Sequence, residues 1–318
     1  MGDPIKLRAV FMGTSSFAAE ILSSLLENKY NIISVYTQPG KKVGRDGGIG
    51  KSAVAEIAEK NDLKVFEPQN FSEETINELK DQKPDMIIVA AYGKILPQEV
   101  LEVPGFGSIN VHASMLPKFR GPSPIQNAIL EGEAETGTTI MLMDQGIDTG
   151  DILKQKKIAI DPDETYPELL SKIAGVSSSL LLETLPFWAE RKIKPQKQNE
   201  NQATYCQLIE REDGKIIWTD DTVSIYNRYR AFIPWPGIFA YWKKNGFNLR
   251  LKLSKISPIK NDFSDKKSGE IFDLDGKAAV KTADGAIILE EVQLEGKAKT
   301  KISDFINGYP DFIGSILE

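Results

Sequence analysis

The chain has 318 residues, of which 41% are apolar and 26% are charged, and its net charge at pH 7 is −6. This length favours two domains, each able to bury a core of its own. The negative charge argues against a general nucleic-acid-binding protein, because neutralising phosphates requires clustered Lys and Arg. One histidine and one cysteine exclude intramolecular disulfide bonds and a Cys/His zinc site, so we expect no metal.

The charge is unevenly distributed along the chain. Residues 1–188 contain 18 Lys and Arg against 26 Asp and Glu, a net charge of −8, whereas residues 189–318 contain 21 against 19, a net charge of +2. A polyanionic partner is therefore expected to bind the second half. Apolar runs such as residues 86–92 are far shorter than the roughly 20 residues that span a membrane. The N-terminus lacks the apolar core of a signal peptide, which predicts a cytoplasmic protein.

Apolar runs and helical patterns alternate in the first half of the chain. Short buried strands are expected at residues 9–12, 32–36, 86–90, 108–111 and 138–142. A helix with an apolar stripe over residues 17–26 follows the first strand, and Ser72 is a suitable N-cap for another. Thr165 and Glu168 have capping-box spacing and open a long helix that Pro186 is expected to stop. The alternation predicts an α/β fold with a doubly wound, mainly parallel sheet.

The composition changes after Trp188. Residues 191–199 are polar and basic with little to bury, which predicts an extended linker. Beyond it, Asp275-Gly276 and Asp284-Gly285 are hairpin signals, and a helix is expected over residues 224–232. Short β-like runs are expected at residues 237–242, 249–253, 270–272 and 286–290. We therefore divide the chain into an α/β domain at residues 1–189, a linker at 190–208 and a small, OB-like C-terminal β-barrel at 209–318.

Asn110 and His112 are two residues apart at the end of an expected strand. Side chains alternate along a strand, so both point to the same face. Ligands of open α/β sheets bind beyond the carboxyl ends of the strands, which is where His112 falls. The alternative is a strand-end histidine with a purely structural hydrogen bond. Because His112 is the only histidine and has an asparagine two residues before it, we favour a functional role.

A glycine-broken acidic loop, MDQGIDTGD at residues 143–151, follows another expected strand. Its two glycines allow the backbone to approach a ligand closely. The alternatives are a solvated turn and a calcium site. The spacing does not match the EF-hand calcium loop, which requires a glycine near its middle and a glutamate at its end. A metal site is therefore disfavoured.

Two other loops are similar to phosphate-binding motifs without matching them. Residues 13–17, GTSSF, lack the Gly-x-Gly-x-x-Gly of nicotinamide enzymes, so we expect this turn to serve packing. Residues 39–51 contain five glycines among basic residues, but Arg45 stands where a P-loop requires glycine. We expect this loop to be mobile. A basic flap over a polyanionic substrate and a plain solvated loop both fit its composition.

Five stretches, spread over much of the chain, resemble the folate-dependent formyltransferases. They read VFMGT at residues 10–14, AYGKILP at 91–97, INVHASMLP at 109–117, RGPSPIQ at 120–126 and DQGIDTGD at 144–151. The resemblance implies three catalytic residues, Asn110, His112 and Asp148. It also implies that the folate is contacted by Ser114, Met115, Leu116 and Pro117 and by the turn at Ile95 and Leu96.

Formyltransferases that act on glycinamide ribonucleotide or amino sugars share the same catalytic core, so the core does not indicate which amine accepts the formyl group. The rest of the chain indicates the acceptor. Residues 231–237, AFIPWPG, are similar to a C-terminal signature of the enzymes that formylate methionyl-tRNA. The basic flap is similar to their tRNA-contacting loop, which implies tRNA contacts by Lys41, Lys42 and Arg45. The flap departs from that pattern, since Lys41-Lys42 replaces Arg-Pro and residues 50–53 lack the usual prolines.

The resemblance therefore implies an enzyme of translation initiation that transfers the formyl group of 10-formyltetrahydrofolate to the α-amino group of methionyl-initiator tRNA. We expect this enzyme to be a monomer. In this chemistry Asn110 would stabilise an oxyanion. His112, oriented by Asp148, would either donate a hydrogen bond as a cation or accept a proton as a neutral base. The alternatives are a formyltransferase for a small amine and an RNA-binding protein with an inactive transferase domain. A nicotinamide dehydrogenase is disfavoured because the glycine fingerprint is absent.

Overall fold

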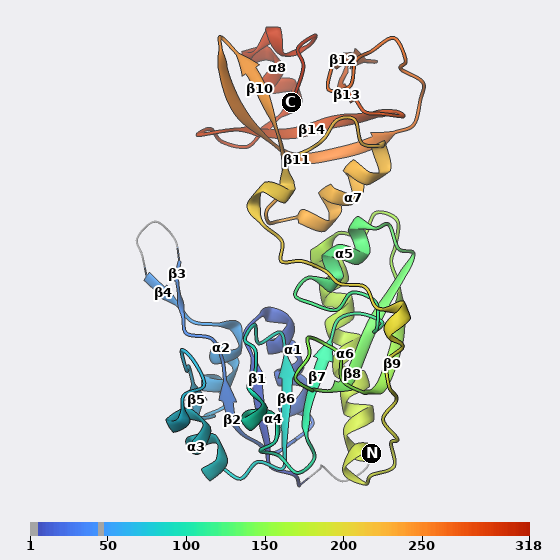
Figure 1. Ribbon diagram of the computed structural model, residues 1–318. Helices are drawn as coiled ribbons and strands as arrows, with labels where there is room; N and C mark the ends of the chain where they lie inside the picture. The colour runs from blue at the N-terminus through green and yellow to red at the C-terminus, as the bar shows by residue number, and fades with distance from the viewer. Residues whose placement is uncertain (1–5, 44–47) are drawn as a thin grey trace. The chain divides into compact units, whose positions relative to one another are not determined.

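The computed structural model describes residues 6–43 and 48–318 of the chain, which divides into two compact units (Figure 1). Unit 1 comprises residues 1–124, 135–159 and 168–207. Unit 2 comprises residues 125–134, 160–167 and 208–318.

Unit 1 is built on a sheet of seven strands in the order β5-β2-β1-β6-β7-β8-β9. The first five are parallel, and β8 and β9 are antiparallel to their neighbours. The prediction of a doubly wound, mainly parallel sheet is confirmed. The strands are β1 (Ala9–Gly13), β2 (Ile32–Tyr36), β5 (Val65–Phe66), β6 (Met86–Ala90), β7 (Ser108–His112), β8 (Glu135–Leu142) and β9 (Ile152–Ala159).

Local sequence signals start the helices of this α/β arrangement. The Ser15 side chain accepts a hydrogen bond from Ala18 N at the start of the first helix, and Ser72 caps the third helix as the sequence predicts. A Cβ on Gly13 would collide with Ala18, so the turn before the first helix does require glycine for packing. The helices up to residue 189 are α1 (Ser16–Glu27), α2 (Ala53–Lys60), α3 (Glu73–Asp81), α4 (Gln98–Leu101), α5 (Pro124–Leu130) and α6 (Tyr166–Ala189). All of α5 except Pro124 belongs to unit 2.

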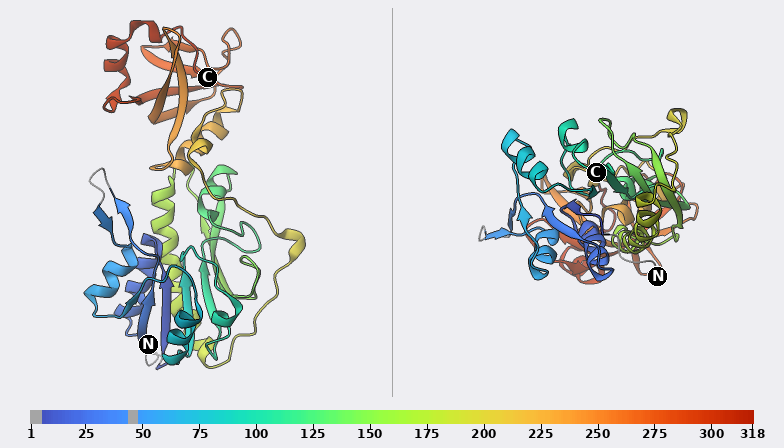
Figure 2. Two further views of the ribbon diagram at one scale, coloured as in Figure 1. Left: turned by 60° about the vertical axis from the view of Figure 1, so that its left-hand side comes forward. Right: turned by 90° about the horizontal axis from the view of Figure 1, so that it is seen from below.

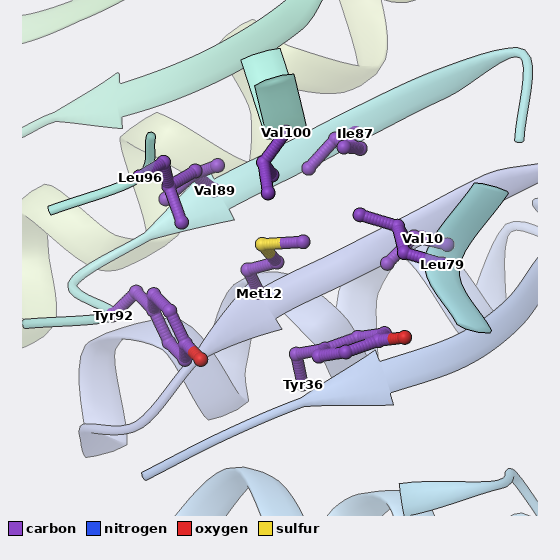
Figure 3. Close-up of a cluster of buried hydrophobic side chains, with 9 residues drawn as sticks. All are labelled: Val10, Met12, Tyr36, Leu79, Ile87, Val89, Tyr92, Leu96 and Val100. Carbon is purple, nitrogen blue, oxygen red and sulfur yellow. The ribbon is translucent and has the colours of Figure 1, made fainter. Parts of the chain in front are cut away.

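One face of the sheet packs against α3 and α4 through a cluster of buried apolar side chains (Figure 3). Alternate residues of the central strands supply its middle, with Met12 of β1 lying between Tyr36 of β2 and the residues of β6. Phe11 and Ile88 point to the opposite face and are also fully buried. Burial of both faces explains why these strands are continuous apolar runs that could be recognised in the sequence.

Pro186 lies inside α6 and does not stop it, contrary to the sequence prediction. Proline lacks the N–H that would bond to the carbonyl of Leu182, four residues earlier. The Tyr30 hydroxyl donates to that carbonyl at 3.5 Å and partly replaces the missing bond. The helix continues to Ala189. In the described parts of the chain, residues 6–43 and 48–318, no helix is long and apolar enough to cross a membrane.

Unit 2 contains the second sheet, which is antiparallel and has the order β10-β11-β14-β13-β12, with β15 paired to β14. Asp275 and Gly276 have φ of 53° and 80°, so the predicted hairpin turn between β12 and β13 forms with both residues left-handed. The elements are α7 (Thr222–Phe232), β10 (Ile238–Lys244), β11 (Phe247–Ile259), β12 (Ile271–Leu274), β13 (Lys277–Lys281), β14 (Ala286–Leu294), β15 (Thr300–Lys301) and α8 (Ile302–Gly308).

The C-terminal residues join the two outer strands of this sheet. Glu318 exchanges two backbone hydrogen bonds with Tyr241 of β10, and Leu317 N donates to Gly269 O beside β12. Leu317 is buried. Because both edges of the sheet are paired in this way, the antiparallel strands curve into a small barrel, as the sequence predicts.

The segment after α6 is extended, but it does not hang free as a linker would. It runs back along the edge of unit 1, where Gln196 pairs with Ile152 of β9 and Tyr205 pairs with Arg120 (Figure 2). These contacts place residues 190–207 in unit 1. Unit 2 also takes residues 125–134 and 160–167. Helix α7 holds the second of these segments: Tyr226 Oη donates to Asp163, and Arg230 donates to Glu164 O. The compact units thus differ from the expected division at residues 189 and 208.

Candidate active site

Asn110 and His112 point to one face at the carboxyl end of β7, as their spacing predicts. Their neighbours Ile109 and Val111 alternate with them along the strand. Both polar side chains are nearly enclosed, with exposed fractions of 9% and 6%. Strand β7 lies next to β6, and β6 lies next to β1. The chain adds β2 and β5 on one side of β1 and then β6 and β7 on the other side, so the direction in which strands are added reverses between β1 and β6. The pair therefore lies near the place where α/β sheets bind their ligands.

Asp148 joins this pair from the loop between β8 and β9. Its Oδ1 accepts a hydrogen bond from Asn110 Nδ2 at 3.2 Å, and its Oδ2 accepts one from Gly121 N at 2.9 Å. The same Oδ2 lies 3.5 Å from His112 Nδ1. The structure thus brings together three residues that are up to 38 positions apart in the sequence.

The other nitrogen of His112 has a fixed partner. His112 Nε2 lies 2.9 Å from the carbonyl oxygen of Phe119. A carbonyl oxygen can only accept, so Nε2 carries a hydrogen in this arrangement. Nδ1 then faces the Asp148 carboxylate, and a proton arriving on Nδ1 would be held there by a charge-assisted hydrogen bond. The ring is therefore oriented for proton exchange at Nδ1.

Arg120 anchors the loop that carries Phe119. Its side chain is fully buried and donates to both carboxylate oxygens of Glu200, at 2.8 and 2.7 Å, and to Tyr205 Oη at 3.0 Å. The hydrogen bond from Arg120 lowers the pKa of the Glu200 carboxyl, and the same interaction raises the pKa of Arg120. Sequence reasoning found Arg120 only as part of a motif, because its partners follow 80 and 85 residues later.

The residues expected to contact folate after β7 form a tight turn around Thr139. Thr139 Oγ1 donates to Ser114 O at 2.6 Å and accepts from Leu116 N at 3.2 Å. The Leu116–Pro117 peptide bond is cis, and Leu116 is buried against Met141 and Ile152. These contacts fix the turn directly after the Asn110 and His112 strand.

Met115, Ile95 and Leu96 complete the expected folate contacts. The Met115 side chain lies against Gly137 of β8, where a Cβ would overlap with its sulfur. Leu96 belongs to the buried cluster of Figure 3, so its side chain serves packing, whereas Ile95 is 83% exposed. An exposed apolar side chain of this size is available to a ligand. Only the backbone of Leu96 remains for the predicted pocket.

The basic flap has an ordered base. Strands β3 (Lys41–Val43) and β4 (Gly48–Gly50) pair as a hairpin, with Lys41 opposite Gly50 and Lys42 opposite Ile49. Arg45, the central residue of the predicted tRNA contact, lies outside the described residues.

A cleft of about 420 Å³ in unit 2 was not found by sequence reasoning. Its lining includes the cations Arg211, Arg250 and Lys252 and the side chain of Trp235, which is 56% exposed. The Arg250 guanidinium lies 3.5 Å from the centre of the Phe239 ring. Arg250 and Lys252 are two residues apart on β11 and so share a face, which is the signal that the sequence offered.

Two family models cover most of the chain. The formyl transferase model matches residues 7–185, and the model of the formyl transferase C-terminal domain matches residues 208–310. Fold and site together therefore define a formyl transferase with both of its domains.

Relatives of known name match over the full length. A methionyl-tRNA formyltransferase from Caldicellulosiruptor saccharolyticus is 43% identical over 97% of this chain and 99% of its own. One from Caldanaerobacter subterraneus is 40% identical over 98% of this chain and 100% of its own. The chain belongs to the formyl transferase family and, within it, to the methionyl-tRNA formyltransferases.

Solved structures share the fold at lower identity. HypX from Aquifex aeolicus, solved in complex with tetrahydrofolic acid, superimposes with a TM-score of 0.65 at 19% identity, over 97% of this chain and 48% of HypX. An N-formyltransferase from Helicobacter canadensis gives a TM-score of 0.64 at 22% identity, over 89% of this chain and 98% of its own. At these identities the likeness establishes the architecture alone.

Proposed function

We propose that this protein transfers the formyl group of 10-formyltetrahydrofolate to the α-amino group of methionyl-initiator tRNA, giving the formylmethionyl-tRNA that starts translation. The observation that carries the proposal is the convergence of Asn110, His112 and Asp148 at the end of β7, in a chain that matches methionyl-tRNA formyltransferases from end to end.

The reaction begins when the neutral amine attacks the formyl carbon and the carbonyl oxygen becomes an oxyanion. Asn110 Nδ2 has two hydrogens, and only one of them is used by Asp148. The second is available to the oxyanion. Removing a donor of this kind lowers turnover by about 10² to 10³. Its low exposure strengthens the effect, because little water competes for the charge.

The amine must lose a proton, and N10 of the folate must regain one when the bond between N10 and the formyl carbon breaks. We assign this transfer to Nδ1 of His112, because Nε2 is held by Phe119 O. Asp148 Oδ2 then stabilises the protonated ring from 3.5 Å. General acid–base catalysis by such a group contributes about 10² to 10⁴ in rate. Catalytic hydrogen bonds often shorten once substrate is bound.

For the donor site we propose that the folate lies along the turn at Ser114, Met115, Leu116 and Pro117 and against Ile95 and the Leu96 backbone. The turn is fixed to β8 through Thr139, and Ile95 offers exposed apolar surface. A preformed turn lowers the entropy lost when the ligand binds. No metal is required in this scheme, since the donors and the proton carrier are side chains.

For the acceptor we propose that unit 1 contacts the aminoacylated end of the tRNA and that unit 2 contacts its backbone. Lys41, Lys42 and Arg45 of the flap are assigned to the first role. The cleft lined by Arg211 and Lys252 fits the second, because it combines cations with an exposed tryptophan on which a base can stack. Such a protein works in the cytoplasm, where aminoacylated tRNA is found. We propose that it acts as a monomer.

The decisive experiment measures transfer of labelled formyl from 10-formyltetrahydrofolate to methionyl-initiator tRNA. Unacylated tRNA, free methionine and a nucleotide-linked amino sugar serve as alternative acceptors. We expect rapid labelling of the charged tRNA alone. Equal labelling of the small amines would favour an amine formyltransferase, and no labelling would favour an inactive RNA-binding protein. Either result contradicts the proposed acceptor.

A further inference from the structure

Residues 196–206, here called the strap, bind the two loops that surround His112. Gln196 exchanges two backbone hydrogen bonds with Ile152, at 2.8 and 2.9 Å. Further along, Thr204 O accepts from Arg120 N at 2.9 Å, and Cys206 N donates to Arg120 O at 2.8 Å. The strap thus contacts both the end of the Asp148 loop and the loop of Phe119 and Arg120.

Gln198 occupies the point of the strap where the two loops meet. Its Nε2 donates to the backbone carbonyls of Asp148 and Gly150, both at 2.8 Å. Its Oε1 accepts from Arg120 Nε at 3.1 Å and from Arg120 Nη2 at 2.9 Å. A primary amide has two hydrogens and two lone pairs, and all four are used here. One side chain therefore connects the Asp148 loop to the Arg120 loop.

Both loops contain a residue whose backbone conformation needs such support. Asp148 has φ of 54° and Phe119 has φ of 59°, the left-handed region that residues with a Cβ seldom adopt. A conformation of this kind persists only where the surroundings hold it. Gln198 holds the carbonyl of Asp148, and Thr204 Oγ1 accepts from Phe119 N at 2.8 Å.

We propose that Gln198 is a positioning residue for the catalytic centre: it sets the distance between Asp148 and His112 Nδ1 by fixing the Asp148 loop to Arg120. The inference rests on the proposed function, because the roles of His112 and Asp148 come from it. Gln198 itself contacts neither the folate nor the amine in this scheme. It acts through the backbone of Asp148, whose carboxylate faces the ring, while Arg120 steadies the Phe119 carbonyl on the other side.

Replacing Gln198 by glutamate tests its hydrogen bonds to Arg120 separately from those to the Asp148 loop. The Q198E carboxylate still accepts from Arg120, but it has no hydrogen to donate to the carbonyls of Asp148 and Gly150. The Asp148 loop is therefore released while Arg120 keeps its partners. Q198A removes both connections. Gln196→Ala is the matched control, because Gln196 is exposed and pairs with Ile152 through backbone atoms alone.

The experiment compares wild type, Q198E, Q198A and Q196A in formyl transfer, with kcat and KM determined separately. We expect Q198E and Q198A to lose about 10- to 100-fold in kcat, with each KM within about threefold of wild type, because small misplacements of catalytic groups have effects of this size. Q196A should match wild type. Thermal unfolding of all four proteins identifies any variant that fails to fold.

The second readout does not depend on activity. His112 is the only histidine in the chain, so the Cε1–H proton of its imidazole gives a single NMR signal that reports on the surroundings of the ring. We expect the chemical shift of that proton to change in Q198E and Q198A and to stay unchanged in Q196A. If wild type transfers no formyl group, the proposed function fails, and the chemical shift still decides whether Gln198 controls the surroundings of His112. An unchanged chemical shift in a folded Q198E overturns the inference, whether or not kcat falls.

Discussion

At the scale of single residues, the Asp148 carboxylate is the common acceptor of the site. Three donors converge on its two oxygens: Asn110 Nδ2, Gly121 N and, when protonated, His112 Nδ1. Asn110 and His112 take part in the proposed reaction, and the hydrogen bond from Gly121 N fixes the carboxylate between these two side chains. A carboxylate is suited to this position because it has acceptor sites on both oxygens and no hydrogen of its own.

Asp148→Asn is therefore expected to be severe although it conserves size. The new amide group would turn its hydrogens toward at least one of the three donors. We expect kcat to fall by about 10² to 10⁴, with little change in folate binding, as measured by single-turnover transfer and by fluorescence titration of a folate analogue. Asp144→Asn is the control, because Asp144 lies in the same loop but accepts only from Gly146 and Thr149. Near-normal turnover in Asp148→Asn would contradict the assignment.

At the scale of elements, the loop between β8 and β9 owes its path to a close approach of backbone to backbone. Leu142 N donates to Asp151 O at 2.9 Å, which closes the loop around Asp148. Gly150 lies directly under the carbonyl of Leu142, and a Cβ on it would fall on that oxygen. The backbone cannot yield as a flexible side chain could, so only glycine fits this position.

Gly150→Ala is expected to displace the loop and to lower the free energy of unfolding by about 1–3 kcal/mol, the usual cost of overpacking. Turnover should fall by at least about 10-fold, since Asp148 moves with the loop. Urea unfolding and the transfer assay measure the two effects. Gly175→Ala in α6 is the control: its Cβ would meet only Glu20 Oε1 at 3.7 Å, and the free energy of unfolding should rise by about 0.5–1 kcal/mol. A G150A protein as active as wild type would show that the loop position is unimportant.

At the scale of the whole molecule, the proposed function divides chemistry and RNA binding between the two units. The catalytic cluster lies in unit 1, and the cleft with Arg211, Arg250 and Lys252 lies in unit 2. The net charge follows the same division, since residues 189–318 carry +2 in a chain of −6. Contacts to phosphates raise affinity for RNA without touching the reaction.

Lys252→Ala is expected to weaken binding of methionyl-tRNA and leave both kcat at saturating tRNA and folate affinity unchanged. The dependence of log affinity on log salt should become shallower by about 1, because one phosphate contact is lost. Filter binding over a series of salt concentrations measures this slope. Lys277→Ala, an exposed lysine of β13 outside the cleft, controls for the loss of one charge. Equal slopes for the two variants would show that the cleft is not part of the RNA-binding surface.

The sequence by itself determined the central strands, the barrel and the three polar residues of the site. Strands such as β1 and β6 are buried on both faces and therefore appear as uninterrupted apolar runs. Strand β9 was missed, because its middle residues are partly or fully exposed and its sequence is largely polar. Asn110 and His112 could be paired by the two-residue period of a strand, which is a local property.

Only the tertiary structure decided how the loops are held. The role of residues 190–207 reversed from linker to support, because its hydrogen bonds are made with residues some 40 to 85 positions earlier. Pro186 lies inside α6, and a tyrosine from a distant segment reaches the Leu182 carbonyl that the proline leaves without its helical partner. Periodicity and capping express interactions between neighbours in sequence. The partners of Arg120 and Gln198 are set by how the chain folds back on itself, and no local pattern records that.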